Sequence, residues 1–492
     1  MKKLMKLVAM AAVMAANAAV MAEIVLTAPY PVSVASGSTT TISEKITGTG
    51  PLVVLGGGTV ALSNSGNDFT GGIIVSNGIV RADAAGSFGT GPISLEGDAT
   101  LRQVRFNANN ATFSNNITLK DKTTSRENPA IYALKSVTIA GTVAIDQDTP
   151  SVGSCYLFMQ SGTSSDKTPK ITINGDYNIG AGRSQLYAYG NMRFNGVISA
   201  TNIYFGGASD VRGVVEVSNP SNVINSSQIY GVNVSCLDTN VLRDAYFQFS
   251  WGTWGRSGGE YGVLILNGHD QRFQYLQSSD NTLAPTVKDC AIKTGASQPA
   301  TVMITGARRT GGTTGNAQIR ISGPVSLLVS NVVDNVSLSQ AIKSREHAGT
   351  GSIEACTNST FRLTYGATAP NVTNIIVRSG GGFFATGVTN ALSSNLKVIR
   401  IEGSGRFYSQ KDCLEPVNCP NADLIMDEAS FFYVWTGVTN TVDHLIIGGK
   451  EVKAGTYTYE TLPQMRNATE LANYAGTLIV RRHHRGMMVK IR

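Results

Sequence analysis

Short runs of alternating apolar and polar residues, separated by Gly and Asn, fill most of this chain. In residues 59–63, Val60 and Leu62 fall on one face of a predicted strand, because alternate side chains of a strand point to the same side. No long stretch shows the 3.6-residue period of an amphipathic helix. The pattern predicts an all-β chain of short strands and turns. Further predicted strands are residues 263–266, 300–304, 397–401 and 445–447.

Internal repetition favours a solenoid over a sandwich, whose core would tolerate the same apolar strands. Residues 63–69 are echoed at 218–224. The pentapeptide 386–390 recurs unchanged at 436–440, and each copy follows an apolar strand and a Phe pair. The two pairs are Phe383-Phe384 and Phe431-Phe432. The sequence thus predicts a parallel β-helix of ~20 to 25 residues per coil, with Gly and Asn at its positive-φ corners.

The Gly-rich segment 57–97 has a defined internal order. Residues 66–72 match a G-N-x-F/Y-T-G-G core, residues 78–82 a G-x-L/V-x-A strand and residues 89–91 a G-x-G turn. In this order the segment resembles the autotransporter-associated β-strand repeat. Within the C-terminal coils predicted at 370–480, residues 442–457 and 476–480 are similar to the ends of exported bacterial proteins of the Verrucomicrobia and Lentisphaerae type. The resemblance implies an exported, right-handed parallel β-helix with irregular loops, spanning residues 23–480.

The two ends of the chain differ from this body. Residues 1–22 carry three Lys, then an apolar run, then small residues, which is typical of a secretory signal peptide. The run is shorter than the ~20 residues that span a bilayer, so no transmembrane span is expected in the mature chain. We expect an exported protein, extracellular or on the cell surface, with the periplasm as an alternative. The basic tail 481–492 is expected to be a disordered stub, or else a sorting or cell-wall contact, and it is shorter than the membrane barrel of a self-translocating passenger.

The net charge of +7 comes from these ends. Without the three Lys of the signal peptide and the five basic residues of the tail, the body holds 32 basic and 33 acidic residues. A nucleic-acid-binding face would need a clear basic excess, so no nucleic-acid partner is expected.

The cysteines form an even set in a chain expected to be exported, where disulfides are permitted. Cys413 and Cys419 flank Pro416 and are the predicted local pair, whereas spacing does not decide how the other four pair. A metal site is the alternative, but no C-x-x-C motif or nearby His favours it. No metal or cofactor is expected. The six are Cys155, Cys236, Cys290, Cys356, Cys413 and Cys419.

Candidate catalytic carboxylates are scattered along the chain. Hydrolysis of a glycan needs two carboxylates ~5 Å or ~6.5 to 9.5 Å apart, which stacked coils can provide. Neighbouring residues of a strand point to opposite faces, so an adjacent His and Asp make no dyad by themselves. The alternative, which we favour, is a charged outer face that discourages aggregation. The candidates are Asp423, Asp427, Glu428, Asp443 beside His444, and Asp270 beside His269.

Two aromatic clusters, 247–255 and 431–435, are candidates for contact with a glycan or a protein partner. Alternation places Phe247, Phe249 and Trp251 on one face of a strand. Packing in the core is the alternative, and we favour it because large rings dominate protein interiors. The candidate contact residues are Phe247, Phe249, Trp251, Trp254 and Trp435.

Together these features favour a secreted or cell-surface structural or adhesive protein without catalytic activity, whose partner is an extracellular glycan or an envelope surface. One alternative is a polysaccharide lyase or glycoside hydrolase, and another is a non-catalytic glycan-binding module. The enzyme hypothesis predicts that at least three acidic or basic side chains from neighbouring coils converge in one groove. A groove lined only by Ser, Thr and Asn would contradict it.

Overall fold

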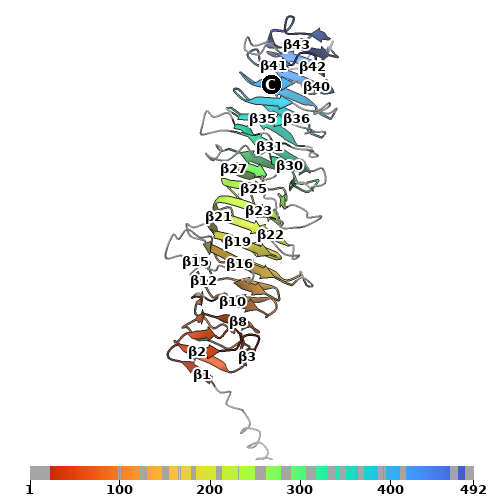
Figure 1. Ribbon diagram of the computed structural model, residues 1–492. Coiled ribbons are helices and arrows are strands. Elements are labelled where there is room, and N and C mark those ends of the chain that lie inside the picture. Colours follow the sequence, from red (N-terminus) through yellow and green to blue (C-terminus); the bar gives the residue numbers. More distant parts are fainter. Residues whose placement is uncertain are drawn as a thin grey trace, which may run out of the picture. The chain divides into compact units, whose positions relative to one another are not determined.

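The chain forms a parallel β-helix, as its sequence predicts. In the computed structural model nearly every described element is a strand, and the strands pair in parallel with equivalent strands of the next coil (Figure 1). Two compact units are distinguished: unit 1 is Met1–Pro150 with Tyr156–Gly175, and unit 2 is Ser151–Cys155 with Asp176–Arg492. The structure describes residues 23–97, 99, 101–120, 130–146, 155–163, 166, 168–178, 184–206, 213–230, 232–249, 262–278, 290–305, 317–330, 338–340, 342–343, 351–357, 359–363, 371–385, 392, 395–409, 417–465 and 475–482.

Unit 1 has three columns of strands. Column A is β2 (Tyr30–Ser33), β5 (Leu52–Leu55), β7 (Ile73–Val75), β9 (Ile93–Leu95), β12 (Ile117–Lys120) and β15 (Val143–Asp146). Column B is β3 (Thr39–Ile42), β6 (Thr59–Leu62), β8 (Gly78–Ala82), β10 (Arg102–Phe106), β13 (Ile131–Ala133) and β16 (Cys155–Ser161). Column C pairs β1 (Glu23–Leu26) with β4 (Lys45–Gly48), and further along β11 (Ala111–Phe113) with β14 (Val137–Ile139) and β17 (Lys170–Ile173).

The core of unit 1 consists of aligned apolar side chains. Leu52, Ile73, Ile93 and Ile117 stack in register along column A, and each is almost fully buried. Equivalent residues lie about one coil apart, with bonded partners 20 residues apart at Asn67 and Ser87 and 34 residues apart at Ser136 and Lys170. Each such side chain contributes roughly 1.5 to 3 kcal/mol on burial, but only after its neighbour in the next coil covers it.

The Gly pair of the Gly-rich segment lets two coils approach closely. A Cβ on Gly71 would lie 2.3 Å from the backbone of Gly50 in the preceding coil. Gly72 has φ +80°, and a Cβ there would lie 2.2 Å from the carbonyl oxygen of Pro92 in the following coil. Any side chain at either position would push the coils apart, which explains why this part of the motif is glycine.

Unit 2 continues the same architecture with three columns of its own. Column D is β18 (Tyr177–Asn178), β21 (Ile198–Gly206), β23 (Val223–Tyr230), β25 (Ala245–Phe249), β27 (Gln271–Ser278), β29 (Ala300–Ile304), β31 (Val325–Val329), β34 (Ser352–Ala355), β36 (Asn374–Val377), β38 (Val398–Ile401), β40 (Asn418–Met426) and β42 (Thr439–Ile447), with β19 (Ser184–Tyr189) beside β21. Column E is β20 (Asn191–Phe194), β22 (Val214–Val217), β24 (Asn233–Cys236), β26 (Val263–Ile265), β28 (Cys290–Lys293), β30 (Ala317–Ser322) and β33 (Ile342–Lys343). Column F is β32 (Leu338–Gln340), β35 (Ser359–Leu363), β37 (Gly382–Ala385), β39 (Arg406–Ser409) and β41 (Phe431–Val434).

Antiparallel strands and a short 3-10 helix cover the last coil of unit 2. β43 (Lys450–Val452) pairs with β42, and β44 (Gly455–Tyr457) pairs with β45 (Thr477–Val480), which itself lies parallel to β42. The helix η1 (Pro463–Met465) contacts β41. These elements occupy edges that would otherwise accept another strand.

The echo between residues 63–69 and 218–224 is a true structural repeat. Asn67 and Asn222 are buried, and each accepts a hydrogen bond from a backbone N–H of the preceding coil and donates one to a carbonyl of the following coil. The partners are Ile46 and Ser87 at 2.8 and 2.7 Å for Asn67, and Ile198 and Val241 at 2.7 and 2.9 Å for Asn222. Both Asn side chains therefore join three coils.

Two more positions of the echo also keep their bonds. The hydroxyls of Ser63 and Ser218 donate to a carbonyl of the preceding coil, and the side chains of Asn64 and Asn219 do the same while capping their own turn. Such Asx turns hold a corner in place without regular secondary structure. The same polar residues thus have the same function in both units.

The apolar strands and the rings of the second repeat keep the same register. Ile375 is in register with Leu424 through Ile399, and Phe383 is in register with Phe432 through Phe407. The strands β37 and β41 are also two coils apart, with β39 between them. Register follows burial, because a slip of one residue would turn every inward ring to solvent. Residues 386–390 lie outside the described part of the chain.

Candidate functional site

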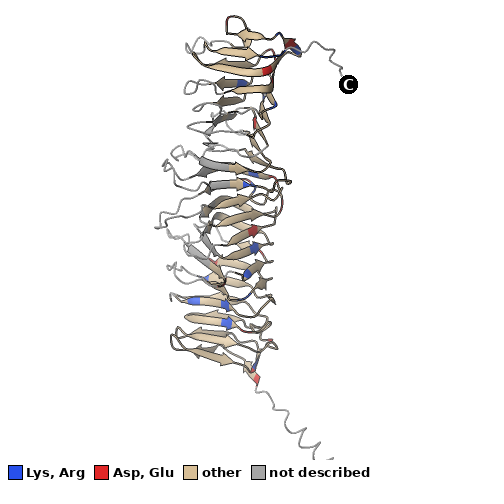
Figure 2. Ribbon diagram, turned by 90° about the vertical axis from the view of Figure 1, so that its right-hand side faces the viewer, with Lys and Arg blue, Asp and Glu red and all other residues tan. Residues whose placement is uncertain are grey.

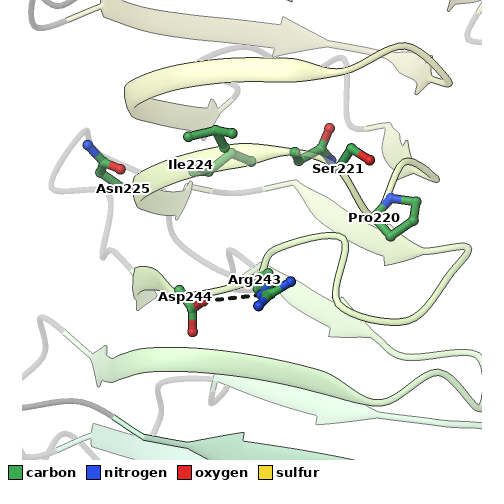
Figure 3. Close-up of a pocket in the computed structure, with 8 residues that line it drawn as sticks. Pro220, Ser221, Ile224, Asn225, Arg243 and Asp244 are labelled. Atoms are coloured by element: carbon green, nitrogen blue, oxygen red, sulfur yellow. Dashed lines mark hydrogen bonds and ion pairs between the residues drawn. The ribbon is translucent and has the colours of Figure 1, made fainter. Parts of the chain in front are cut away.

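A cavity of about 340 Å³ opens on unit 2, between the first residues of β23 and the turn before β25 (Figure 3). Its size is near the lower end of the ~300 to 1,000 Å³ typical of small-molecule pockets. Asn222 and Ile224 are buried, and the other lining residues are exposed. The lining residues are Pro220, Ser221, Asn222, Val223, Ile224, Asn225, Arg243 and Asp244.

Turn chemistry builds both walls of this cavity. On one side, the side chain of Asn219 accepts a hydrogen bond from the N–H of Ser221, and the anchored Asn222 fixes the start of β23. On the other side, Asn240 and Asp244 both have φ +57°, a conformation that Asn and Asp tolerate better than most residues. The chain consequently leaves Val223 with 60 % of its surface exposed, although it is apolar.

Asp244 is held by arginines on two sides. Arg272, from β27, donates to both carboxylate oxygens, with a distance of 2.7 Å from its Nε to Oδ1. Hydrogen bonding to Arg272 is the largest cause that lowers the pKa of Asp244, and the same bond raises the pKa of Arg272. Arg243 touches the same carboxylate only through Nε, at 3.3 Å (Figure 3). Two cations and one anion therefore leave a positive charge at the cavity wall.

Three of the predicted catalytic residues, Asp423, Asp443 and His444, lie close together in the last coils of unit 2. Asp423 lies opposite His444 across β40 and β42, and its Oδ1 is 2.8 Å from Nδ1 of His444. Asp443 Oδ2 is 3.6 Å from the same nitrogen, and Asp443 Oδ1 is 3.3 Å from Nε of Arg482. An imidazole between carboxylates suits proton transfer, but His444 is only 6 % exposed, which leaves a substrate little access to the ring. We interpret the cluster as a clamp that ties the tail to β42 and β40.

Two of the remaining catalytic candidates accept hydrogen bonds from backbone groups of a neighbouring coil. A carboxylate oxygen of Asp427 accepts a hydrogen bond from the N–H of Gly403 at 2.6 Å. Asp270 likewise accepts one from the N–H of Thr301 at 2.6 Å. Glu428 is exposed. Within the described residues, no group of three or more His, Cys, Asp or Glu is placed to hold a metal ion.

The aromatic candidates are corrected in part by burial. Phe247 and Phe249 are 0 % and 1 % exposed and pack against each other with ring centroids 5.1 Å apart, so their predicted role in partner contact is wrong and the core alternative is confirmed. Trp435 is partly exposed after β41. Trp251 and Trp254 lie outside the described residues.

A second row of rings runs along the outer face of column F. Tyr408 stacks between Phe384 and Tyr433, with centroid distances of 4.1 and 4.8 Å and interplanar angles of 8° and 13°. Both faces of the Tyr408 ring are thus covered by neighbouring rings. A sugar that stacks on an aromatic side chain needs a free ring face, and Tyr408 offers none.

The predicted disulfide between Cys413 and Cys419 is not formed. Cys419 is a free thiol, fully buried, whose Sγ donates to the carbonyl oxygen of Leu392 at 3.6 Å. Burial raises the pKa of this thiol to about 12, which keeps it protonated and unreactive at neutral pH. Cys413 lies outside the described residues.

Alkylation tests this thiol directly. Iodoacetamide at neutral pH is expected to leave Cys419 unmodified in the folded protein and to label it after unfolding in guanidinium without reductant, as read by peptide mass spectrometry. The unfolded sample is the positive control, because burial no longer protects the thiol there. Recovery of a peptide that links Cys413 to Cys419 before reduction would contradict the structure.

Comparisons of the chain with protein-family models, with curated proteins and with solved structures found no match. Across the residues that the structure describes, there is no helix both long and apolar enough to cross a membrane.

The cavity between β23 and the turn before β25 was not predicted from the sequence. Its only sequence signal is the echo at 218–224, which marks one wall, whereas the other wall comes from a turn with no matching motif.

Proposed function

We propose that this protein is an exported structural or adhesive module of the cell surface, without catalytic activity, of the kind that its resemblance to autotransporter-associated repeats implies. The observation that supports the proposal is that buried polar side chains form hydrogen bonds between consecutive coils. Asn67 and Asn222 join consecutive coils through equivalent hydrogen bonds in both units. A chain that repeats such bonds is organised to maintain a stacked surface.

The charged side chains support the same function. Arg378 donates to Glu354 at 2.7 Å and to Glu402 at 2.7 and 2.8 Å, and these partners lie 24 residues before and after it, one coil away on each side. Figure 2 shows charged residues of both signs along the strands and turns in that view. Most carboxylates described above accept a hydrogen bond from a residue in a neighbouring coil, as expected of groups that hold the stacked coils together.

A combined binding and cleavage assay tests the proposal. The full chain is incubated with a panel of polysaccharides and cell-wall preparations, and both retention on the polymer and release of reducing ends or unsaturated sugars are measured. We expect binding to at least one preparation without shortening of the polymer. A glycosidase or lyase active on the same polymer serves as the positive control.

Two results would contradict this function. Failure to bind any polysaccharide or cell-wall preparation would remove the adhesive part. Cleavage that disappears in the variant Asp423→Asn would instead support the enzyme alternative, because that variant removes the carboxylate charge beside His444 with little change in shape.

A further inference from the structure

The groups around the cavity of unit 2 divide into an apolar side and a hydrogen-bonding side. Pro220 and Val223 are exposed apolar residues, and Val223 has 60 % of its surface exposed. The hydroxyl of Ser221 and the amide of Asn225 make no hydrogen bond with the rest of the described chain. A ligand with an apolar face and polar edges would satisfy both sides, and a sugar ring has that character.

Arg243 adds the positive charge. Because Arg272 already holds Asp244 through two bonds, the single long contact of Arg243 with that carboxylate leaves its two terminal nitrogens without a partner among the described residues. A guanidinium with two parallel N–H donors matches a carboxylate or a sulfate in bidentate geometry. Asp244 meanwhile contacts the guanidinium of Arg243 through Nε, at 3.3 Å, where both residues line the cavity (Figure 3).

We propose that this cavity binds a sugar unit of an acidic polysaccharide, with Arg243 holding its carboxylate or sulfate group. Ser221 and Asn225 bond to hydroxyls of the same sugar, and Pro220 and Val223 contact its C–H face. This inference rests on the proposed adhesive function and adds to it a ligand class and a site.

Titration calorimetry with defined oligosaccharides tests the site. The probes are an oligogalacturonate, its methyl ester as a neutral counterpart, and a dextran sulfate oligomer, each added to the full chain at low salt. Binding of either anionic probe, at least about tenfold tighter than binding of the methyl ester, supports the proposal. Equal affinity for the oligogalacturonate and its ester, with no binding of the sulfated oligomer, would overturn it.

Paired variants connect the binding to Arg243. Arg243→Gln is expected to weaken binding of the anionic probe at least about tenfold, and Arg243→Lys to weaken it less because the charge stays. The matched control is Arg193→Gln, since Arg193 is a partly exposed arginine of the same unit whose nearest carboxylate oxygen, on Glu216, is 3.9 Å away. Circular dichroism confirms that each variant folds.

The results distinguish failure of the proposed sugar site from failure of the proposed adhesive function. If the chain binds an acidic polysaccharide and Arg243→Gln binds it as tightly as the unchanged protein, the site is wrong and the adhesive function stands. If the chain binds no polysaccharide and no cell-wall preparation, both are wrong.

Discussion

Replacing Phe407 by alanine is expected to lower the free energy of unfolding of the C-terminal coils by about 3 to 5 kcal/mol. Phe407 is fully buried and stacks between Phe383 and Phe432, with both centroid distances at 4.9 Å. Its loss leaves a cavity and also breaks two aromatic contacts in a row that joins three coils. Urea unfolding followed by tryptophan fluorescence measures the effect, because all three Trp residues lie in unit 2.

The neighbouring residue provides the control. Tyr408 is on the same strand and stacks with similar geometry, but its ring lies on the outer face and is partly exposed. Tyr408→Ala should therefore lower the free energy of unfolding by about 1 to 2 kcal/mol, clearly less than Phe407→Ala. Equal losses for the two variants would show that inward burial does not distinguish the two rows, contrary to the structure.

Replacing Asn67 by alanine is expected to lower the free energy of unfolding of unit 1 by about 2 to 4 kcal/mol. The variant leaves the N–H of Ile46 and the carbonyl of Ser87 without their buried partner, and each unsatisfied group costs about 1 to 3 kcal/mol. Hydrogen exchange of the coils around residue 67 measures the loss, since unit 1 holds no Trp. The amide of Ile46 should lose protection first.

Two further variants make the result specific to the repeat. Asn222→Ala in unit 2 should show a loss of similar size, because its two bonds are equivalent. Asn64→Ala removes the hydrogen bonds to the carbonyl of Ser43 and from the N–H of Gly66, both at an exposed corner where water can replace the lost partner, and should lower the free energy of unfolding by less than about 1 kcal/mol. A small effect at Asn67 together with a large one at Asn64 would contradict the assigned functions of the two residues.

Residues brought together across coils were harder to predict than residues within one strand. Phe247 and Phe249 are two apart, so alternation alone placed them on the same face, although it did not say that the face is internal. Asp423 and His444 are 21 residues apart, and their meeting depends on a shift of register in β40 between Cys419 and Asp423. Such a shift leaves no local pattern in the sequence.

The cavity shows the same limit. Arg272 and Asp244 are 28 residues apart, whereas bonded partners in neighbouring coils are 20 residues apart at Asn67 and Ser87 and 34 residues apart at Ser136 and Lys170. The number of residues between bonded partners thus varies from coil to coil. No fixed period in the sequence therefore aligns Arg272 with Asp244, although the 20 residues between Val223 and Arg243 match the predicted length of a coil.

The sequence by itself determined the class of fold, because a strand has a period of two and Gly and Asn adopt positive φ at the corners more readily than most residues. It also determined the echo between residues 63–69 and 218–224, whose polar residues keep their hydrogen bonds. Only the tertiary structure decided which rings face inward, that Cys419 stays a free thiol, and where Arg243 meets a cavity. The physical reason is that coil length is set by turns, and a residue acquires its neighbour in the next coil only when that coil closes.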